Sequence, residues 1–298
     1  MKLAVVIMTY NEAKHLDRCF ASLLALDAEI HVIDCFSSDD TLTIARRSGA
    51  IVHENAWVNH AEQFNWGLTQ LPNTIDWVLR LDADEYLTPA LVDEINKKLS
   101  ACSDDVGGIS IPRRINFLGK LIKYGGVNKI HTVRLFRAGQ GRCENRWMDE
   151  HIVVQGKLLK FKNELIDENL NPISWWVEKH NGYASREAVE LLNLRYGFMP
   201  YDSIAKLSTK SQASLKRWVK ENLYSKTPLG LRAFAYFVYR YILLGGFLDG
   251  SRGFAFHFLQ GFWYRYLVDI KISEVERSMQ SQNLSVQEAI YDVLKIRV

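Results

Sequence analysis

The sequence predicts an α/β fold, with a mixed sheet flanked by helices and a helical, aromatic-rich carboxy-terminal extension. Short apolar, β-branched runs alternate with helix-like segments through the first half of the chain. From residue 179 onward the pattern becomes helical. With 48% hydrophobic and 24% charged residues in 298, the composition is that of a folded protein. We therefore expect two parts, residues 1–198 and residues 199–298.

The first part contains the elements of an open, layered sheet. The expected strands cover residues 3–8, 30–34, 77–81 and 108–111. The expected helices between them cover residues 12–25, 39–48 and 60–70. Strand–helix–strand alternation at this spacing gives right-handed crossovers. Because ligands bind such sheets at the carboxyl ends of the strands, the polar residues that end these strands are the first candidates for chemistry.

Asp82-Ala83-Asp84 directly follows the apolar run 77–81, which places both carboxylates at the carboxyl end of a strand. Hard divalent cations bind carboxylate oxygens, and Mg²⁺ commonly uses one or two of them together with substrate phosphates. A cation at this position neutralises a departing diphosphate. The alternative is a solvated acidic turn. The position after a strand favours the cation site.

Asp34 ends the second apolar run and is followed by a turn that carries hydroxyl groups and Asp39. A carboxylate at that position can accept hydrogen bonds from the ring N–H of a base or from a hydroxyl. We therefore expect Asp34 to recognise a nucleotide. For Asp39, a helix N-cap is at least as good an interpretation as a ligand contact.

The first apolar run ends in the turn MTYNE, residues 8–12. A polar Thr-Tyr-Asn turn after a buried strand can receive a nucleotide base against Tyr10. Asn11 is also suited to begin the next helix, so the turn alone is a weak signal.

Several segments occur in an order and at a spacing that are specific together. They are VVIMTYNE (5–12), HVIDCFSSDDT (31–41), AEQFNWGL (61–68) and WVLRLDADE (77–85). This set resembles the nucleotide-sugar-binding half of family 2 glycosyltransferases, which are inverting enzymes with the GT-A fold. Further along, RWMDEH (146–151), VEKHNGYASREAVE (177–190) and GFLDGSRGF (246–254) resemble a bacterial subgroup that builds lipopolysaccharide core and other surface glycans.

The resemblance implies a metal-dependent hexosyltransferase that uses a Mg²⁺ or Mn²⁺ ion and a nucleotide-sugar donor, with uracil as the expected base. Asp82 and Asp84 are then the pair at the metal and the diphosphate, and Asp34 holds the pyrimidine. The remaining nucleotide-sugar-binding residues that it implies are Thr9, Tyr10, Asn11, Glu12, Gln63, Asn65 and Arg80. Gln63 and Asn65 stand where the family often has Arg-Asn, and Arg80 could replace the missing positive charge.

An inverting transfer needs one general base that removes the proton of the acceptor hydroxyl. The segment at residues 148–151 supplies Asp149 and Glu150. The subgroup usually has a His-Glu pair here, so Glu150 matches the acid of the family and Asp149 stands where His is expected. We favour Glu150 and leave Asp149 open.

His180 is the third candidate metal ligand, beside Asp84 and Asp82, because a neutral imidazole ligates divalent metals. A lone His near a helix start is more often a surface or capping residue, and that interpretation is the stronger one.

The carboxy-terminal part is basic and aromatic. Residues 199–298 carry 14 Lys and Arg against 8 Asp and Glu, and residues 234–266 hold 13 of the 35 aromatic residues. Helices are expected at 184–196 and 203–221, with boundaries at Pro200 and Pro228. Arginines that interrupt the aromatic run favour a helix lying in the plane of an anionic membrane surface, with an Arg-bearing face and an apolar face. The alternative is packing on the protein itself, and nucleic acid is not an expected partner.

These patterns lead to one expected function and one alternative. The expected function is transfer of a sugar to a lipid-linked or lipopolysaccharide-core glycan acceptor. The alternative is a non-catalytic, membrane-associated glycan-binding or scaffold protein. The apolar run 3–8 is too short for an export signal, and no uncharged stretch of about 18 residues suggests a spanning helix. We therefore expect a cytoplasmic protein, peripheral on the inner face of the cytoplasmic membrane.

Overall fold

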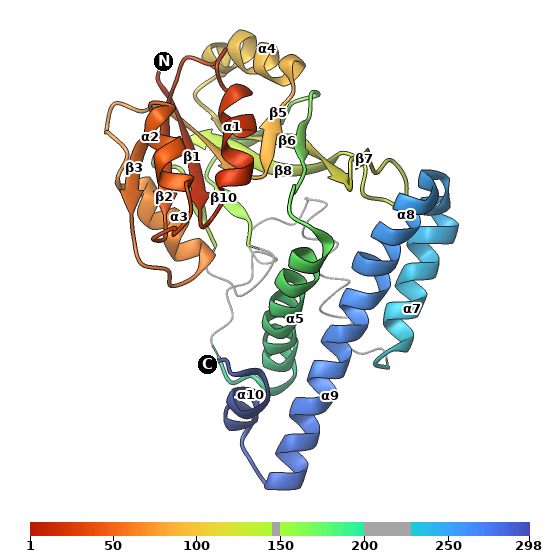
Figure 1. The fold of residues 1–298 in the computed structure, drawn as a ribbon. Coiled ribbons are helices and arrows are strands. Elements are labelled where there is room, and N and C mark those ends of the chain that lie inside the picture. The colour runs from red at the N-terminus through yellow and green to blue at the C-terminus, as the bar shows by residue number, and fades with distance from the viewer. Residues whose placement is uncertain (145–149, 200–227) are drawn as a thin grey trace. The chain divides into compact units, whose positions relative to one another are not determined.

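The computed structural model describes residues 1–144, 150–199 and 228–298 (Figure 1). These residues form two compact units. The sheet unit contains residues 1–123, 127–144 and 150–171, and the helical unit contains residues 124–126, 172–199 and 228–298. The expected helix at 203–221 and the expected boundary at Pro200 lie outside the described residues.

A ten-stranded sheet forms the centre of the sheet unit, in the order β3-β2-β1-β4-β8-β6-β12-β5, with β7 and β11 paired to β6. Its strands are β1 (Leu3–Thr9), β2 (Ala28–Asp34), β3 (Ile51–Glu54), β4 (Trp77–Asp82), β5 (Glu85–Leu87), β6 (Val106–Phe117), β7 (Lys120–Leu121), β8 (Ile130–Arg137), β11 (Lys157–Lys160) and β12 (Leu165–Asp167). From β3 to β4 the strands are parallel, whereas β8 pairs antiparallel with both β4 and β6. The predicted α/β class with a mixed sheet is therefore confirmed. A separate antiparallel pair consists of β9 (Gly141–Cys143) and β10 (Ile152–Val154).

Helices cover both faces of this sheet (Figure 1). They are α1 (Ala13–Ala21), α2 (Thr41–Arg47), α3 (His60–Thr69), α4 (Pro89–Lys98) and the short 3₁₀ helix η1 (Leu99–Ala101). Leu16 of α1 and Ile95 of α4 are buried in one core cluster, and Phe64 of α3 is buried in another. Gly67 lets α3 approach β2 closely, because a Cβ there would lie 2.7 Å from Cγ1 of Ile33.

The region after residue 111 is more regular than the sequence suggests. The fourth expected strand, 108–111, is the buried part of the longer β6, and β8 is a further long strand. The second half of β6 contains arginines, so its sequence does not have the apolar pattern that indicates a strand. Their charges are compensated by residues distant in sequence, because Arg113 pairs with Asp167 at 3.3 Å and Arg114 with Glu164 at 3.0 Å.

The helical unit is built around α5 (Ile173–Tyr196), α9 (Tyr264–Gln282) and α10 (Val286–Leu294), which share an apolar core. Its remaining elements are α7 (Leu231–Val238), the π-helix η4 (Tyr239–Leu243), the 3₁₀ helix η5 (Gly246–Asp249), α8 (Gly250–Phe256) and the π-helix η6 (His257–Trp263). Because α5 packs on α9, the two units divide between Asn171 and Pro172, upstream of the boundary at 198/199 expected from the sequence.

The aromatic segment does not have the Arg-bearing face that the sequence suggests. Arg232 and Arg240 are buried, each with only 4% of its surface exposed. No single helix among the described residues is both long and apolar enough to cross a bilayer. Leu231–Leu243 and Gly246–Gln282 meet that criterion only as a pair, bent by 69°.

Candidate active site

The carboxyl ends of β1, β2 and β4 bring together residues that are far apart in the sequence. Thr9 is opposite Asp34 in the β1–β2 ladder, and Met8 is opposite Asp82 in the β1–β4 ladder. The three strands are parallel, so these residues share one edge of the sheet. This is the edge at which the sequence predicts ligand binding.

Asp34 is fully buried at this edge and is held by a closed set of hydrogen bonds. Its Oδ1 accepts from Thr9 Oγ1 at 2.7 Å and from Ser37 Oγ at 2.6 Å, and its Oδ2 accepts from the Ser37 backbone N–H at 2.7 Å. Asp34 and Thr9 therefore fix the β2–α2 turn in the described structure. A nucleotide contact by Asp34 would have to use the remaining acceptor capacity of Oδ2.

The β1–α1 turn is linked to the β2–α2 turn by Asn11, which has a left-handed backbone with φ of 55°. Its side-chain oxygen accepts from the Ser38 N–H at 2.8 Å, and its own N–H donates to Ser37 Oγ at 2.8 Å. Asn residues tolerate this conformation better than most. Asn11 therefore does not cap α1, as the sequence suggested it could, and instead holds two turns together.

Tyr10 and Glu12 flank Asn11 and differ in their surroundings. Tyr10 is 60% exposed, so its ring is available for a base to stack on. Glu12 accepts a hydrogen bond from His15 Nδ1 at 2.6 Å, and its backbone N–H donates to Thr41 Oγ1 at 2.8 Å. Tyr10 is therefore the exposed candidate of this turn, and Glu12 supports its shape.

Asp39 is not the N-cap residue of α2, which is Asp40, but its carboxylate accepts hydrogen bonds at the start of two helices. Its carboxylate accepts from the Thr41 N–H at 3.0 Å and from the Ala13 N–H at 3.2 Å, which are the first residues of α2 and α1. Partial burial alone would raise the pKa of Asp39, but the hydrogen bonds from Thr41 and Ala13 outweigh it and lower that pKa. These hydrogen bonds give Asp39 a structural role at the start of α1 and α2.

Asp82 is the last residue of β4 and lies between two guanidinium groups. Arg134 Nη2 is 3.2 Å from Oδ2 of Asp82, and Arg80 Nη2 is 3.5 Å from Oδ1. Burial alone would raise the pKa of Asp82, but the positive charges of Arg134 and Arg80 hold that pKa well below its usual range. Asp82 is therefore ionised and already has counter-charges within the protein.

Glu85 and Arg134 are buried, contact each other and lie next to Asp82. Arg134 Nη2 contacts Glu85 Oε1, and Glu85 Oε2 accepts from the Asp82 backbone N–H at 3.1 Å. Burial and the negative charge of Asp82 raise the pKa of Glu85 to about 8, against the opposing effect of Arg134. The sequence analysis did not select either residue. The signal for Arg134 is a cation between the apolar residues Val133 and Leu135 of β8.

Asp84 differs from Asp82 in that, within the described parts of the chain, no cationic side chain forms an ion pair with it. Its backbone oxygen accepts from Arg18 Nη2 at 3.3 Å and from the Glu168 N–H at 3.0 Å, which fixes the turn. Its carboxylate accepts one hydrogen bond, from Asn169 Nδ2 at 3.0 Å. Asp84 is therefore the carboxylate with free acceptor capacity on a fixed backbone.

This donor set fits a cation that takes most of its ligands from outside the protein. Residues 1–144, 150–199 and 228–298 contain no cluster of three or more His, Cys, Asp or Glu side chains suited to a metal ion. Mg²⁺ is usually held by only one or two carboxylates together with phosphates and water. Asp84, with Asp82 beside it, meets that requirement.

Gln63 and Asn65 of α3 are both engaged in internal contacts. Gln63 is buried, and its side-chain oxygen accepts from Asn55 Nδ2 at 3.0 Å. Asn65 donates to the Cys143 carbonyl at 2.9 Å and accepts from the Cys143 N–H at 2.8 Å. Asn65 thus anchors β9. Neither Gln63 nor Asn65 has a side-chain group left free for a diphosphate.

Arg80 is almost completely buried in the sheet unit. Its guanidinium packs over the ring of Phe64, 5.4 Å from the ring centroid. It donates from Nη2 to His60 Nε2 at 3.1 Å and forms an ion pair with Asp82. In this arrangement Arg80 compensates the charge of Asp82, so the sequence-based role at the diphosphate remains a hypothesis.

Of the two candidate bases, Asp149 lies outside the described residues and Glu150 lies two residues before the start of β10. The β9–β10 pair closes the base of this loop, since Cys143 is opposite Ile152. Buried Glu144, which the sequence analysis missed, accepts from the His151 N–H at 3.0 Å and strengthens the closure. Glu150 is partly exposed and therefore accessible for proton transfer.

His180 belongs to the helical unit and is engaged there in aromatic packing. Its ring stacks on Trp176 with centroids 3.4 Å apart, and its Nδ1 is 2.8 Å from the Trp176 carbonyl oxygen. Burial lowers the pKa of His180 to about 4, so the ring is neutral. A neutral ring packed in this way serves the α5–α9 core, and a metal contact for His180 remains a hypothesis.

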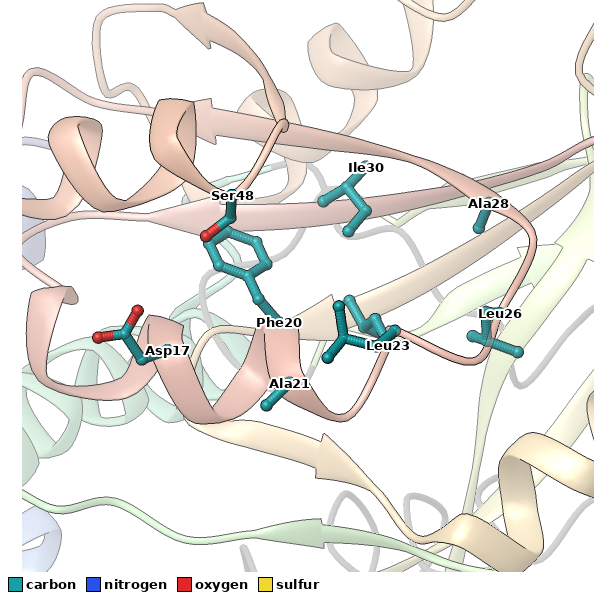
Figure 2. Close-up of a pocket in the computed structure, with 9 residues that line it drawn as sticks. Asp17, Phe20, Ala21, Leu23, Leu26, Ala28, Ile30 and Ser48 are labelled. Carbon is teal, nitrogen blue, oxygen red and sulfur yellow. The ribbon is translucent and has the colours of Figure 1, made fainter.

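One shallow pocket lies elsewhere on the sheet unit (Figure 2). It is lined mostly by apolar side chains of α1, of the turn that follows it and of the first residues of β2, among them Phe20, Leu23 and Ile30. Ala28 begins β2 and Asp34 ends it, so this pocket is at the opposite end of the strand from the predicted site. It contains none of the predicted site residues.

Comparison with known proteins identifies the class to which this sheet edge belongs. Residues 4–143 match the family described as glycosyl transferase family 2. The match includes β1, β2 and β4 with the aspartates at their ends. The sheet unit therefore carries a family 2 glycosyltransferase domain, as the sequence motifs predict.

Two curated relatives support this assignment. An uncharacterized glycosyltransferase of Rickettsia felis is 35% identical over 104 residues, which are 35% of this chain and 36% of that protein. The lipopolysaccharide core biosynthesis glycosyltransferase LpsC of Rhizobium meliloti is 29% identical over 202 residues, which are 63% of this chain and 71% of LpsC. The match with the Rickettsia relatives spans only about a third of their length.

A similar solved structure extends the fold comparison over most of the chain. The mannosyltransferase PcManGT of Pyrobaculum calidifontis, in complex with GDP-Man and Mn²⁺, superposes with a TM-score of 0.52 at 13% identity. The superposition covers 91% of this chain and 86% of PcManGT. The likeness confirms a GT-A-type fold with a helical carboxy-terminal region.

Proposed function

We propose that this chain is an inverting, metal-dependent hexosyltransferase. It moves a sugar from a nucleotide-sugar donor to a lipid-linked or lipopolysaccharide-core glycan acceptor. The observation that carries the proposal is the contrast between Asp84, which no cation neutralises in the described structure, and Asp82, which two arginines neutralise. A family 2 domain with one such free carboxylate at the end of β4 is suited to hold a cation against a diphosphate.

A Mg²⁺ or Mn²⁺ ion held by Asp84, with Asp82 beside it, would supply the positive charge that stabilises a departing nucleotide diphosphate. Arg18 and Glu168 fix the backbone of Asp84, so its carboxylate needs little reorganisation to bind. The exposed ring of Tyr10 offers a face to the base, and the Thr9–Asp34 hydrogen bond shapes the turn beside it. Uracil is the expected base on family resemblance, and GDP-Man in PcManGT makes guanine the alternative to test.

Glu150 is proposed as the general base, with Asp149 as the second candidate. A partly exposed carboxylate can accept the proton of an acceptor hydroxyl as that oxygen attacks the anomeric carbon from the face opposite the leaving group. The carbon–oxygen bond to the diphosphate breaks as the new glycosidic bond forms, so the configuration inverts. Asn65 and Glu144 hold the two ends of β9 and β10 near this loop.

The acceptor class follows from relatedness to LpsC, which is named for lipopolysaccharide core biosynthesis. An acceptor of that kind is amphiphilic and belongs to a membrane. We therefore propose that the protein works in the cytoplasm, on the inner face of the cytoplasmic membrane.

A panel of UDP- and GDP-sugars tests this function through thermal stabilisation with and without Mn²⁺. The expected result is metal-dependent stabilisation by one donor, which Asp84→Asn removes. Glu150→Gln is expected to retain that stabilisation and to lose transfer. A chain that no donor stabilises in either condition would instead be a non-catalytic glycan-binding protein.

A further inference from the structure

The helical unit contains a helical hairpin whose surface is unusual for a protein surrounded by water. Its first arm is α7 with η4, its second arm is η5, α8 and η6, and we define the hairpin tip as residues 239–248. Phe237 of the first arm packs on Phe254 and Phe258 of the second, with ring centroids 6.5 and 6.2 Å apart. Figure 1 shows α7 and α8 side by side.

The hairpin tip exposes large apolar side chains instead of polar ones. From Ile242 to Leu248 the chain reads ILLGGFL and contains no polar side chain. Leu243 is 72% exposed and Leu248 57% exposed, and Tyr239, Ile242 and Phe247 are also exposed. Turns that face water are normally rich in Asn, Asp, Ser and Pro as well as Gly. The apolar turn therefore indicates a different environment.

The charges of the hairpin point inward. Arg232 forms a buried ion pair with Asp269, and its Nε is 2.8 Å from Oδ1. Arg240 donates from Nε to the Gly125 carbonyl at 3.0 Å, and buried Asp249 accepts from the Tyr124 N–H at 2.9 Å. Between residues 229 and 263, all of which the structure describes, Arg252 is the one charged residue on the surface. A helix bound to headgroups by charge would carry its arginines outward.

Several backbone groups of the tip are hydrogen-bonded within the protein. The Leu244 N–H donates to the Tyr239 carbonyl at 2.9 Å, and the Leu248 N–H donates to the Gly245 carbonyl at 2.9 Å. The Leu244 carbonyl accepts from the Gly125 N–H at 3.0 Å. Irregular backbone enters hydrocarbon only where the protein supplies its hydrogen-bond partners. The Tyr124–Gly126 segment supplies one here.

From these observations we infer that the hairpin tip inserts into one leaflet of a lipid bilayer and leaves on the side from which it entered. The first arm, Leu231–Leu243, is about 20 Å long at 1.5 Å per residue, shorter than the hydrocarbon core of about 30 Å. The chain then bends by 69°, and the second arm packs back on the first through Phe237, Phe254 and Phe258. Binding then depends on apolar side chains, with Arg252 left at headgroup level. The inference builds on the proposed function, because it seats the enzyme at the membrane that holds its acceptor.

A second copy of the chain is a poorer occupant of this surface. Stable dimers bury about 800 Å² per partner over a packed, complementary patch. The exposed side chains here belong to both arms and to the turn that joins them. An apolar turn without exposed charge matches the interior of a leaflet.

Flotation with vesicles of phosphatidylcholine alone, and of phosphatidylcholine with phosphatidylglycerol, tests the inference. Raising the salt from about 0.1 M to about 1 M shortens the Debye length from about 10 Å to about 3 Å and screens headgroup attraction. The expected result is that the full-length chain floats with both kinds of vesicle and stays bound at high salt. Binding only to the anionic vesicles, and its loss at high salt, would overturn the inference.

The decisive variant is the double substitution Leu243→Asp with Phe247→Asp, which should weaken vesicle binding at least tenfold. Leu24→Asp is the matched control, because Leu24 is an 85% exposed leucine of the sheet unit and should leave binding unchanged. Equal binding by the double variant and the wild type would contradict insertion. So would a wild-type dimer, seen by light scattering, that the double variant converts to a monomer while neither binds vesicles.

Donor-dependent thermal stabilisation without vesicles separates this inference from the proposed function. The double variant changes no residue assigned to the donor site, so it should keep the stabilisation while losing the vesicles. A wild-type chain that inserts but responds to no donor would refute the proposed function and leave the insertion intact.

Discussion

Arg134 reaches Asp82 and Glu85 through a single nitrogen: its Nη2 lies 3.2 Å from Asp82 Oδ2 and also contacts Glu85 Oε1. Arg134 comes from β8, whereas both acids flank the turn that carries Asp84. One guanidinium thus couples the central sheet to the candidate metal site. The first two predictions follow from this relationship.

Arg134→Met is expected to destabilise the protein by about 3–5 kcal/mol, because it removes the cation that buried Glu85 and partly exposed Asp82 share. Chemical denaturation of the wild type and of the variant measures the difference. Arg137→Met is a comparison within the same strand at a less buried guanidinium, and it should cost less. Equal losses for the two variants would contradict a special role for Arg134.

Asp84→Asn and Asp82→Asn should have opposite profiles. Asp84→Asn is expected to leave the free energy of unfolding almost unchanged, since an amide oxygen can still accept from Asn169, and to abolish Mn²⁺-dependent donor binding. Asp82→Asn should destabilise the fold, because Arg134 and Arg80 lose their common counter-charge. Denaturation curves and donor titrations with and without Mn²⁺ on both variants measure the contrast. If Asp82→Asn proves the more stable of the two, the assignment of the neutralised aspartate is wrong.

Asn65→Ala removes both hydrogen bonds to the Cys143 backbone and should cost about 1–3 kcal/mol. Because Cys143 precedes the loop that carries Glu150, transfer should fall more than donor affinity does. Kinetics with the donor identified in the nucleotide-sugar panel, together with donor titration, separate the two effects. Thr69→Ala, near the end of the same helix and exposed, is the control, and a parallel loss in both variants would indicate a general effect on α3.

The stability of the sheet unit should fall in acid because of a histidine pair on β2 and β3. His31 Nδ1 is 3.1 Å from His53 Nε2, and the rings are stacked. Burial, together with the neighbouring His53, lowers the pKa of His31, and burial lowers the pKa of His53. Both folded pKa values lie below the unfolded value of about 6.5, so the unfolded chain binds more protons. Their contribution to stability is therefore complete above about pH 6.5 and decreases as the pH falls.

Denaturation at about pH 7.5 and about pH 5 measures this pH dependence. His31→Gln and His53→Gln should each reduce the difference between the two conditions, because one titrating ring is gone. A pH dependence identical to that of the wild type in both variants would exclude the pair as its source.

Much of the sheet edge was predictable from the sequence, because it depends on local order. Asp34 and Asp82 end strands that are apolar and β-branched, and parallel strands place such ends together. The position of Asp84, the proposed metal ligand, follows from the same pattern. Once Asp82 was assigned to a strand end, little more information was needed to locate this edge.

The partners of those residues could not be predicted, because they come from distant parts of the chain. Arg134 and Asn169 reach the site through antiparallel strands and loops whose pairing no local period encodes. For the same reason, the sequence did not indicate that Gln63 is hydrogen-bonded to Asn55 and Asn65 to Cys143, so the roles expected for Gln63 and Asn65 did not take these contacts into account. The direction of Arg232 and Arg240 was misjudged because Asp269 and Gly125, which they contact, lie outside the aromatic run or far upstream of it.

The antiparallel pairing of β4 with β8 also constrains how the sheet can assemble. A strand that slips by one residue turns every side chain to the other face. If β8 paired one position out of register, Arg134 would point away from Asp82 and Glu85, and the buried side chains of Arg134 and Glu85 would lose their contact with each other. The contacts of Arg134 therefore penalise misaligned pairing of these strands during folding, independently of any catalytic work that the finished edge performs.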